Sequence, residues 1–100
     1  MTSRGPGWQD SLRKSMPEMA QQMSALQETI TKDGALPQKT KVLMMMLCDA
    51  LLGHNDGVAN LARRAKSLGA TEGEVAETVA MAYLMGGLPG LVTGANAFRE

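Results

Sequence analysis

The chain has 100 residues, which is enough for one small domain with a modest hydrophobic core. Hydrophobic residues make up 44% of the chain but aromatic residues only 3%. We therefore expect a core of Ala, Leu, Val and Met, a composition that favours helices. Ten basic and ten acidic residues cancel, and without net positive charge we expect no nonspecific binding to nucleic acid or to anionic membranes.

The cysteine content and the N-terminus indicate a cytoplasmic protein. A single cysteine, Cys48, excludes an internal disulfide framework and a cysteine-rich zinc site, and fits a reducing compartment. Residues 1–9 lack the apolar stretch of a secretory signal. The longest apolar run, residues 42–48, is far shorter than the roughly 20 residues needed to cross a bilayer, so no membrane segment is expected.

The first third of the chain is predicted to be an arm followed by one helix. Residues 1–14 are expected to be a flexible or docking arm, because Gly5, Pro6 and Gly7 resist regular structure and only Trp8 offers a large side chain to bury. A helix is predicted over residues 16–31, with Ser15 and Glu18 as a capping box. Apolar residues at alternating spacings of four and three support this helix: Leu12, Met16, Met19, Met23, Leu26 and Ile30.

Two central helices are predicted over residues 38–52 and 55–68, separated by Gly53 and closed by Gly69. The first contains seven consecutive apolar residues, which cover two helical turns and face every direction. A protomer of this size rarely surrounds a helix completely. We therefore expect other copies of the chain to complete the core.

A fourth helix is predicted over residues 72–86, beginning at a capping box of Thr71 and Glu74. A turn rich in glycine follows at residues 86–90, and a short last helix begins at Leu91. The expected fold is therefore an all-α, five- to six-helix bundle, formed as a single domain over residues 1–100.

Residues 41–70 resemble the carboxymuconolactone decarboxylase and alkyl hydroperoxidase D family. Lys41-Val42-Leu43-Met44 stands where the family has a Lys-Glu-Leu-Ile-like helix, and Gly69-Ala70 ends the following helix as in the family. Residues 83–89 resemble the Tyr-x-Gly-x-Pro stretch of the decarboxylase branch. The resemblance covers about residues 16–98, and it implies an oligomeric helical bundle, a homo-trimer or hexamer.

The family's Cys-x-x-Cys-x-x-x-His motif is replaced in this chain. His54 stands at the first cysteine position, Gly57 at the second and Leu61 at the histidine position, and Val42 stands near the position of the proton-relay glutamate. A dithiol peroxidase cycle cannot close without two thiols. Leu61 can neither donate nor accept a proton, so the resemblance implies a degenerate site.

His54, the only histidine, is the main candidate for a rearranged site. It could act as a general base with Asp56 or Asp49, or it could cap or pack locally at the start of its helix. One imidazole with one carboxylate is too few for a metal site, and no cofactor is expected. Asp49 itself is expected either to pair with Arg63 or Arg64 or to line a ligand pocket.

The sulfur-containing side chains are interpreted as packing. Cys48 lies within the most apolar helix, where burial would make its thiol inert, and Asp49 beside it disfavours a thiolate. Met44, Met45 and Met46 diverge by about 100 degrees per residue, so they cannot converge on one copper ion. We expect the methionines to be adaptable packing, around a flexible apolar pocket.

The basic residues Arg63, Arg64 and Lys66 are interpreted as a solvated face, with anion binding as the alternative.

Three functional hypotheses follow. The first is a non-redox homo-oligomer that binds a small apolar or aromatic ligand or serves as a structural assembly. The second is an enzyme, either lactone decarboxylase-like or peroxide-handling, that uses a rearranged site around His54. The third is partner binding through the arm that carries Trp8 or through the heptad-like apolar stripe that begins at Leu12.

Overall fold

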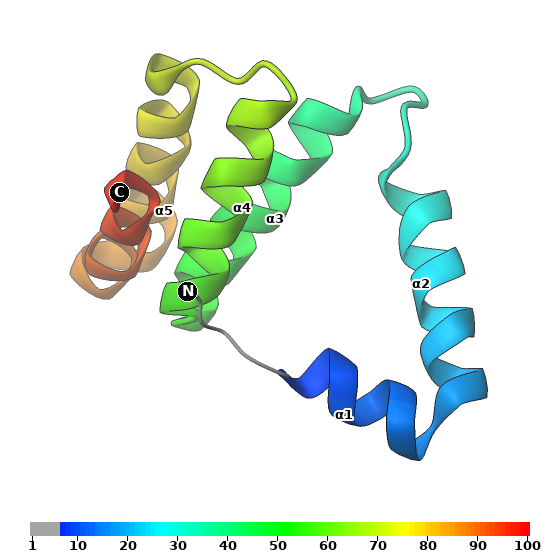
Figure 1. Ribbon diagram of the computed structural model, residues 1–100. Coiled ribbons are helices and arrows are strands. Elements are labelled where there is room, and N and C mark those ends of the chain that lie inside the picture. Colours follow the sequence, from blue (N-terminus) through cyan, green and yellow to red (C-terminus); the bar gives the residue numbers. More distant parts are fainter. Residues whose placement is uncertain (1–6) are drawn as a thin grey trace. The chain divides into compact units, whose positions relative to one another are not determined.

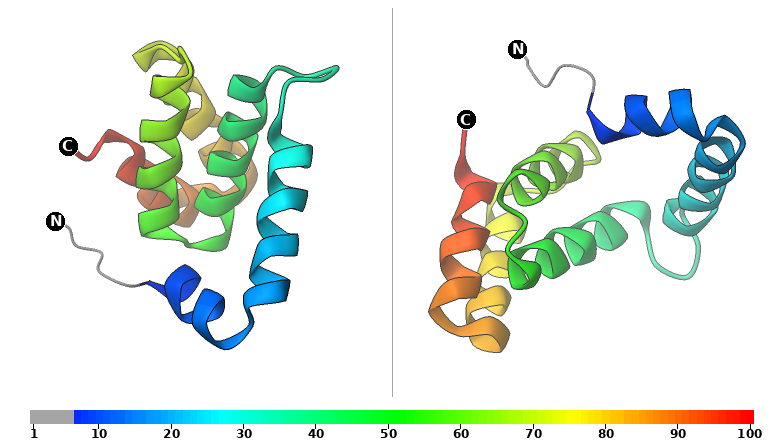
Figure 2. Two further views of the ribbon diagram at one scale, coloured as in Figure 1. Left: turned by 45° about the vertical axis from the view of Figure 1, so that its right-hand side comes forward. Right: turned by 90° about the horizontal axis from the view of Figure 1, so that it is seen from below.

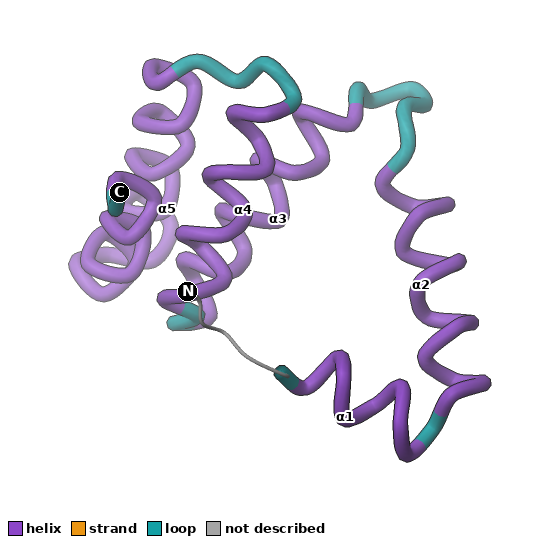
Figure 3. The backbone as a smooth tube through the Cα atoms, in the orientation of Figure 1, coloured by secondary structure: helices purple, strands orange, loops and turns teal. Residues whose placement is uncertain are grey.

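The computed structural model describes residues 7–100, which form helices and no strand (Figure 3). Five α-helices and one 3-10 helix follow one another along the chain (Figure 1): α1 Trp8–Ser15, α2 Pro17–Thr31, α3 Gln38–Leu52, α4 Asn55–Ser67, α5 Glu72–Gly94 and η1 Ala95–Phe98. The predicted all-α class with five to six helices is confirmed. Contacts divide the chain into two compact units, Met1–Lys32 and Asp33–Glu100, and the single domain predicted over residues 1–100 stays a prediction.

The first unit begins its helical structure earlier than the sequence suggested. Residues 8–14 of the predicted arm belong to α1, and residues 1–6 of it lie outside the described part of the chain. The break falls at Met16, with φ −140° and ψ 63°, because Pro17 disfavours a helical conformation in the residue before it. Met16, not Ser15, therefore precedes α2, and no side chain caps this helix, so the predicted capping box with Glu18 is wrong.

The first unit buries little of its apolar surface. Ala20 is its one buried residue among those described in α1 and α2. Trp8 is 62% exposed and lines a hollow between the two helices together with Leu12, Ala20 and Met23. The docking of a partner at Trp8 stays a prediction.

The second unit contains the main hydrophobic core. Helices α3 and α4 form an antiparallel pair, α5 packs against α3, and η1 packs against α4 and α5 (Figure 2). Small side chains on the facing surfaces let the helices approach closely. The core consists of Val42, Met46 and Ala50 from α3, Val58, Ala62 and Ala65 from α4, Val75, Val79 and Ala82 from α5, and Ala70 and Ala97.

Local signals set the ends of these helices. Gly53 ends α3 in the left-handed conformation, with φ 81°, and Gly69 takes φ 101° after α4. The Thr71 side chain accepts a hydrogen bond from the Glu74 amide, and the Glu74 side chain accepts one from the Thr71 amide. The predicted capping box at the start of α5 is therefore confirmed.

Helix α5 is interrupted at Gly87, where φ 67° and ψ −159° lie outside the helical region. The chain then turns back on itself, and a Cβ atom at Gly90 would overlap with the carbonyl oxygen of Ala82. By length and composition alone, residues Glu72–Phe98 are apolar enough to cross a membrane. The interruption at Gly87 divides them into stretches shorter than the roughly 20 residues of a membrane span.

Two rows of apolar side chains face outward from the second unit. Met44, Cys48 and Leu52 recur every four residues on α3, and all three are exposed. Leu84 and Met85 on α5 are each 70% exposed. The predicted burial of Cys48 is therefore wrong, because α3 turns Val42, Met46 and Ala50 into the core against α4 and α5, and Cys48 lies on another face of the helix.

Candidate functional site

A histidine and an aspartate meet where α3 turns into α4. Asp49 lies in the last turn of α3, and His54 immediately precedes α4. The Nδ1 atom of His54 lies 2.8 Å from Oδ1 of Asp49. The two side chains are 58% and 24% exposed, so the pair is open to solvent on the side of the imidazole.

Gly53 brings these two residues together. Its left-handed conformation reverses the chain after α3, and the backbone amide of His54 then donates to the carbonyl oxygen of Asp49 at 2.9 Å. The imidazole is thereby directed back toward the Asp49 carboxylate. His54 does not cap α4 with its side chain, so this part of the local interpretation is wrong.

The pairing sets the chemistry that the imidazole offers. An ionised carboxylate only accepts hydrogen bonds, so Nδ1 of His54 donates to Asp49. In the neutral form of the ring, a proton on Nδ1 leaves a lone pair on Nε2, and the structure gives this atom no hydrogen-bond partner among residues 7–100. An imidazole oriented in this way by a carboxylate can accept a proton or a hydrogen bond from a ligand.

Other charged groups do not form the pairs predicted for them. Neither Arg63 nor Arg64 pairs with Asp49; Nη2 of Arg63 instead donates to Oδ1 of Asn60 at 2.7 Å. Asp56 is not the partner of His54, because its Oδ1 atom lies 3.2 Å from Nη2 of Arg99. Asp49 and Asp56 were both predicted as possible partners of His54, and the turn at Gly53 selects Asp49.

Metal coordination finds no support among the described residues. No group of three or more His, Cys, Asp or Glu side chains in residues 7–100 could hold a metal ion. The three consecutive methionines diverge: Met46 is buried in the core, at 1% exposure, whereas Met44 and Met45 face outward.

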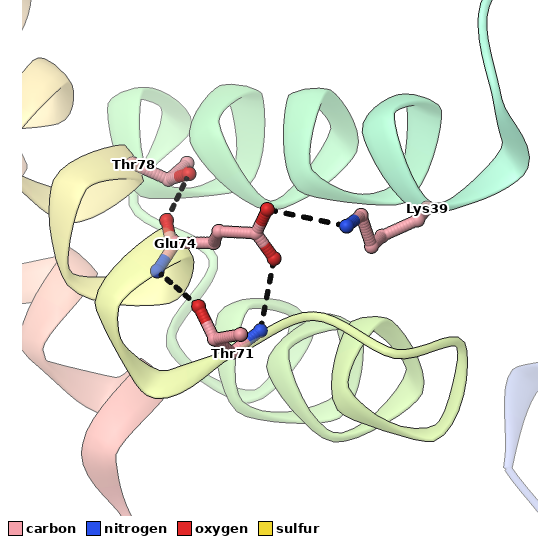
Figure 4. Close-up of polar contacts among 4 residues, drawn as sticks. All are labelled: Lys39, Thr71, Glu74 and Thr78. Carbon is pink, nitrogen blue, oxygen red and sulfur yellow. Dashed lines mark hydrogen bonds and ion pairs between the residues drawn. The ribbon is translucent and has the colours of Figure 1, made fainter.

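A second polar cluster lies at the other end of the α3 helix (Figure 4). Nζ of Lys39 donates to Oε2 of Glu74 at 3.1 Å, and the Thr71 amide donates to Oε1 of the same carboxylate at 2.9 Å. The hydrogen bond from the Thr71 amide, followed by that from Lys39, lowers the pKa of Glu74 below the usual glutamate value. The sequence revealed the capping box but not Lys39, which lies 35 residues from Glu74.

The comparisons with known proteins identify the family of this chain. Residues 17–100 match the model of the carboxymuconolactone decarboxylase family. The chain belongs to this family. It is also similar to a crystal structure of the apo form of a carboxymuconolactone decarboxylase family protein from Legionella pneumophila, with 38% sequence identity and a TM-score of 0.81. The match covers 87% of this chain and 78% of the other, and no functionally curated protein gave a significant match.

The positions at which this family member departs from the dithiol motif lie on or just before α4. His54 and Gly57 stand where the resemblance places the two cysteines, at the start of this helix. Leu61, at the histidine position, packs against the hydrophobic core. Val42, near the position of the relay glutamate, is fully buried in that core. Apolar packing thus occupies the positions at which the resemblance places two of the family's polar groups.

Proposed function

We propose that this family member is a homo-oligomer, of three or six copies, that binds a small apolar or aromatic molecule and performs no dithiol redox cycle. One observation carries the proposal: the second unit presents exposed apolar side chains on both α3 and α5, including Met44, Leu52, Leu84 and Met85. Exposed apolar side chains gathered on the surface of a small protein mark interaction sites and ligand-binding grooves. The single thiol also fits a reducing, cytoplasmic location.

The same surface supports both parts of the proposal. Permanent interfaces between subunits are more hydrophobic than transient ones, which fits the leucines on α5. Methionine side chains adapt to irregular partners and line flexible apolar pockets, which fits the methionines on α3. With Cys48 as the only cysteine in the sequence, an intramolecular disulfide cannot form in any step of the function.

The oligomer is tested by light scattering after size-exclusion chromatography. The wild type should elute as a trimer or hexamer at micromolar concentration, and Leu84→Glu should dissociate it, because the new charge would be buried in the interface. Arg64→Glu introduces the same side chain on the polar face of α4 and should leave the mass unchanged. A stable wild-type monomer would contradict the proposal.

Ligand binding is tested with toluene as the probe. The nine methionines supply methyl resonances that report on apolar pockets. Toluene should shift a subset of these resonances in a saturable way. An intact oligomer whose methionine resonances do not respond would instead indicate the structural assembly.

A second candidate function is an acid–base enzyme, lactone decarboxylase-like or peroxide-handling, at the His54 site. The contact of 2.8 Å between Nδ1 of His54 and Asp49 favours it, because a carboxylate-oriented imidazole is a general base. The assays are lactone and peroxide turnover by the wild type and by His54→Ala. Turnover that His54→Ala abolishes would establish the enzyme; equal rates for the two proteins would exclude His54 from catalysis.

A further inference from the structure

Gly57 lies in the first turn of α4, directly against the carboxylate of Asp49. A Cβ atom at this position would overlap with Oδ2 of Asp49 and would lie 3.0 Å from its Cγ atom. Real Cβ atoms essentially never come within 3.0 Å of another heavy atom, so this carboxylate oxygen would have to move. The Asp49 carboxylate thus occupies the space that the side chain of any other residue at position 57 would need.

The two oxygens of this carboxylate have different neighbours. Oδ1 lies 2.8 Å from Nδ1 of His54, and Oδ2 lies over Gly57. A side chain at position 57 would push the carboxylate away and with it the acceptor that holds the imidazole. The position of the histidine ring therefore depends on a glycine that does not contact the ring nitrogens.

We infer that Gly57 is a positioning residue for His54. By leaving room for Asp49, it keeps the proton of the imidazole on Nδ1 and leaves the lone pair of Nε2 for a ligand. The ligand class that matches this lone pair is a small apolar molecule with a hydroxyl group that donates a hydrogen bond. This ligand class rests on the proposed binding function, whereas the role of Gly57 does not.

The carboxylate of Asp49 explains why position 57 does not carry a cysteine. The resemblance places the second cysteine of the motif at position 57, and a cysteine there would carry the Cβ atom that Asp49 excludes. Asp49, His54 and Gly57 are thus one arrangement, in which a carboxylate has taken the place of a thiol. Restoring a single residue of the motif would disrupt this arrangement without restoring the dithiol.

The tautomer of His54 provides the first test. The chain has one histidine, so the nitrogen-15 spectrum of labelled protein shows one imidazole, and in alkaline solution it reports which nitrogen carries the proton. The wild type should show the Nδ1–H form. Gly57→Ala should shift it toward the Nε2–H form that predominates in free histidine, whereas an unchanged tautomer in folded Gly57→Ala would overturn the inference.

Gly73→Ala is the matched control. Gly73 also lies in the first turn of a helix, and a Cβ atom there would lie 3.7 Å from Oγ1 of Thr71, an ordinary contact distance. This variant should keep the Nδ1–H form of His54. A tautomer change in Gly73→Ala as large as that in Gly57→Ala would contradict a specific role of Gly57.

A double-mutant cycle covers the case in which Gly57→Ala unfolds the protein. The clash requires the Asp49 carboxylate, so Gly57→Ala should lower the urea midpoint in the wild-type background and raise it in the Asp49→Ala background, where alanine only favours the helix. An equal loss in both backgrounds would overturn the inference.

Phenol and toluene together test the ligand class. Phenol should shift the Nε2 resonance of His54, and toluene, which lacks the hydroxyl group, should not. If both compounds shift the methionine methyl resonances but neither moves Nε2, the ligand class is wrong while the proposed binding function stands. If neither compound shifts any resonance, the proposed binding function fails as well, and the tautomer measurement still decides the role of Gly57.

Discussion

The two ends of the α3 helix are held against its neighbours in opposite ways. At the N-terminal end, Lys39 and the Thr71 amide both bind the Glu74 carboxylate, so polar side chains link α3 to α5 (Figure 4). At the C-terminal end, Asp49 pairs with His54, and one imidazole nitrogen has no partner among the described residues. Both ends contain a carboxylate in contact with a nitrogen atom, but only at the C-terminal end does that nitrogen belong to an imidazole with a second ring nitrogen.

The two ends of α3 also differ in how closely neighbouring segments approach one another. At the C-terminal end of α3, a Cβ atom at Gly86 would lie 2.6 Å from Cδ2 of Leu51, and one at Gly90 would overlap with the Ala82 carbonyl oxygen. The C-terminal end of α3 depends on glycines, which leave room for neighbouring atoms, whereas the N-terminal end depends on polar side chains. Adding a methyl group at one of these glycines should therefore destabilise the C-terminal end, and removing a polar group should destabilise the N-terminal end.

The largest effect is expected from Gly90→Ala. The methyl group would overlap with backbone, which cannot rotate away as a side chain can, so the folded state should lose about 3 kcal/mol. Urea unfolding provides the measurement. Gly73→Ala is the control and should gain about 0.5 to 1 kcal/mol from helix propensity. Equal urea midpoints for the wild type and Gly90→Ala would contradict the close contact between Gly90 and the Ala82 carbonyl group.

Thr71→Ala should destabilise the protein by about 1 kcal/mol, because the Glu74 amide loses its capping acceptor. The loss of unfolding free energy is measured in urea at neutral pH. Thr71→Ser retains the hydroxyl group and should retain most of the stability. A similar loss in both variants would mean that the threonine methyl group, not the cap, stabilises this end.

Acid should weaken the N-terminal end through Glu74. Since its pKa is lowered in the folded state, Glu74 contributes stability above the ordinary glutamate pKa, and this contribution is lost as the pH falls through the lowered value. The stability difference between wild type and Glu74→Gln should therefore shrink from about pH 7 to about pH 3. Lys39→Gln should retain part of this pH dependence, because the Thr71 amide remains. A difference that does not vary with pH would contradict the lowered pKa.

The smallest effect is expected at the ion pair between Lys66 and Glu72. Its Nζ–Oε2 distance is 3.1 Å, but the Glu72 side chain is 75% exposed, so solvent screens the attraction. Lys66→Gln should cost about 0.5 kcal/mol or less at low salt and nothing measurable at high salt. A larger loss of unfolding free energy that persists in high salt would show that packing of the aliphatic part of Lys66, and not its charge, stabilises the contact between α4 and the start of α5.

Local patterns predicted much of the second unit. The predicted helix over residues 38–52 matches α3, the predicted helix over residues 55–68 ends one residue beyond α4, and the capping box at Thr71 is present. These features depend on apolar spacing and on capping groups within a few residues, which a sequence displays directly. The early start of α1 was missed because Gly5, Pro6 and Gly7 favoured an irregular arm before Leu12, and because this helix buries no residue.

Composition, periodicity and residue identity are properties of the chain alone, so they were sufficient to predict the helical class, the residues of α3 and α4, and the presence of a single thiol. Three features became visible in the folded chain alone: Asp49 pairs with His54 and not with Arg63, Glu74 pairs with Lys39, and Cys48 faces outward. Each of these depends on where a turn directs a side chain and on how much space the neighbouring helix leaves. The overlap that a Cβ atom at Gly57 would produce shows how narrow that space is.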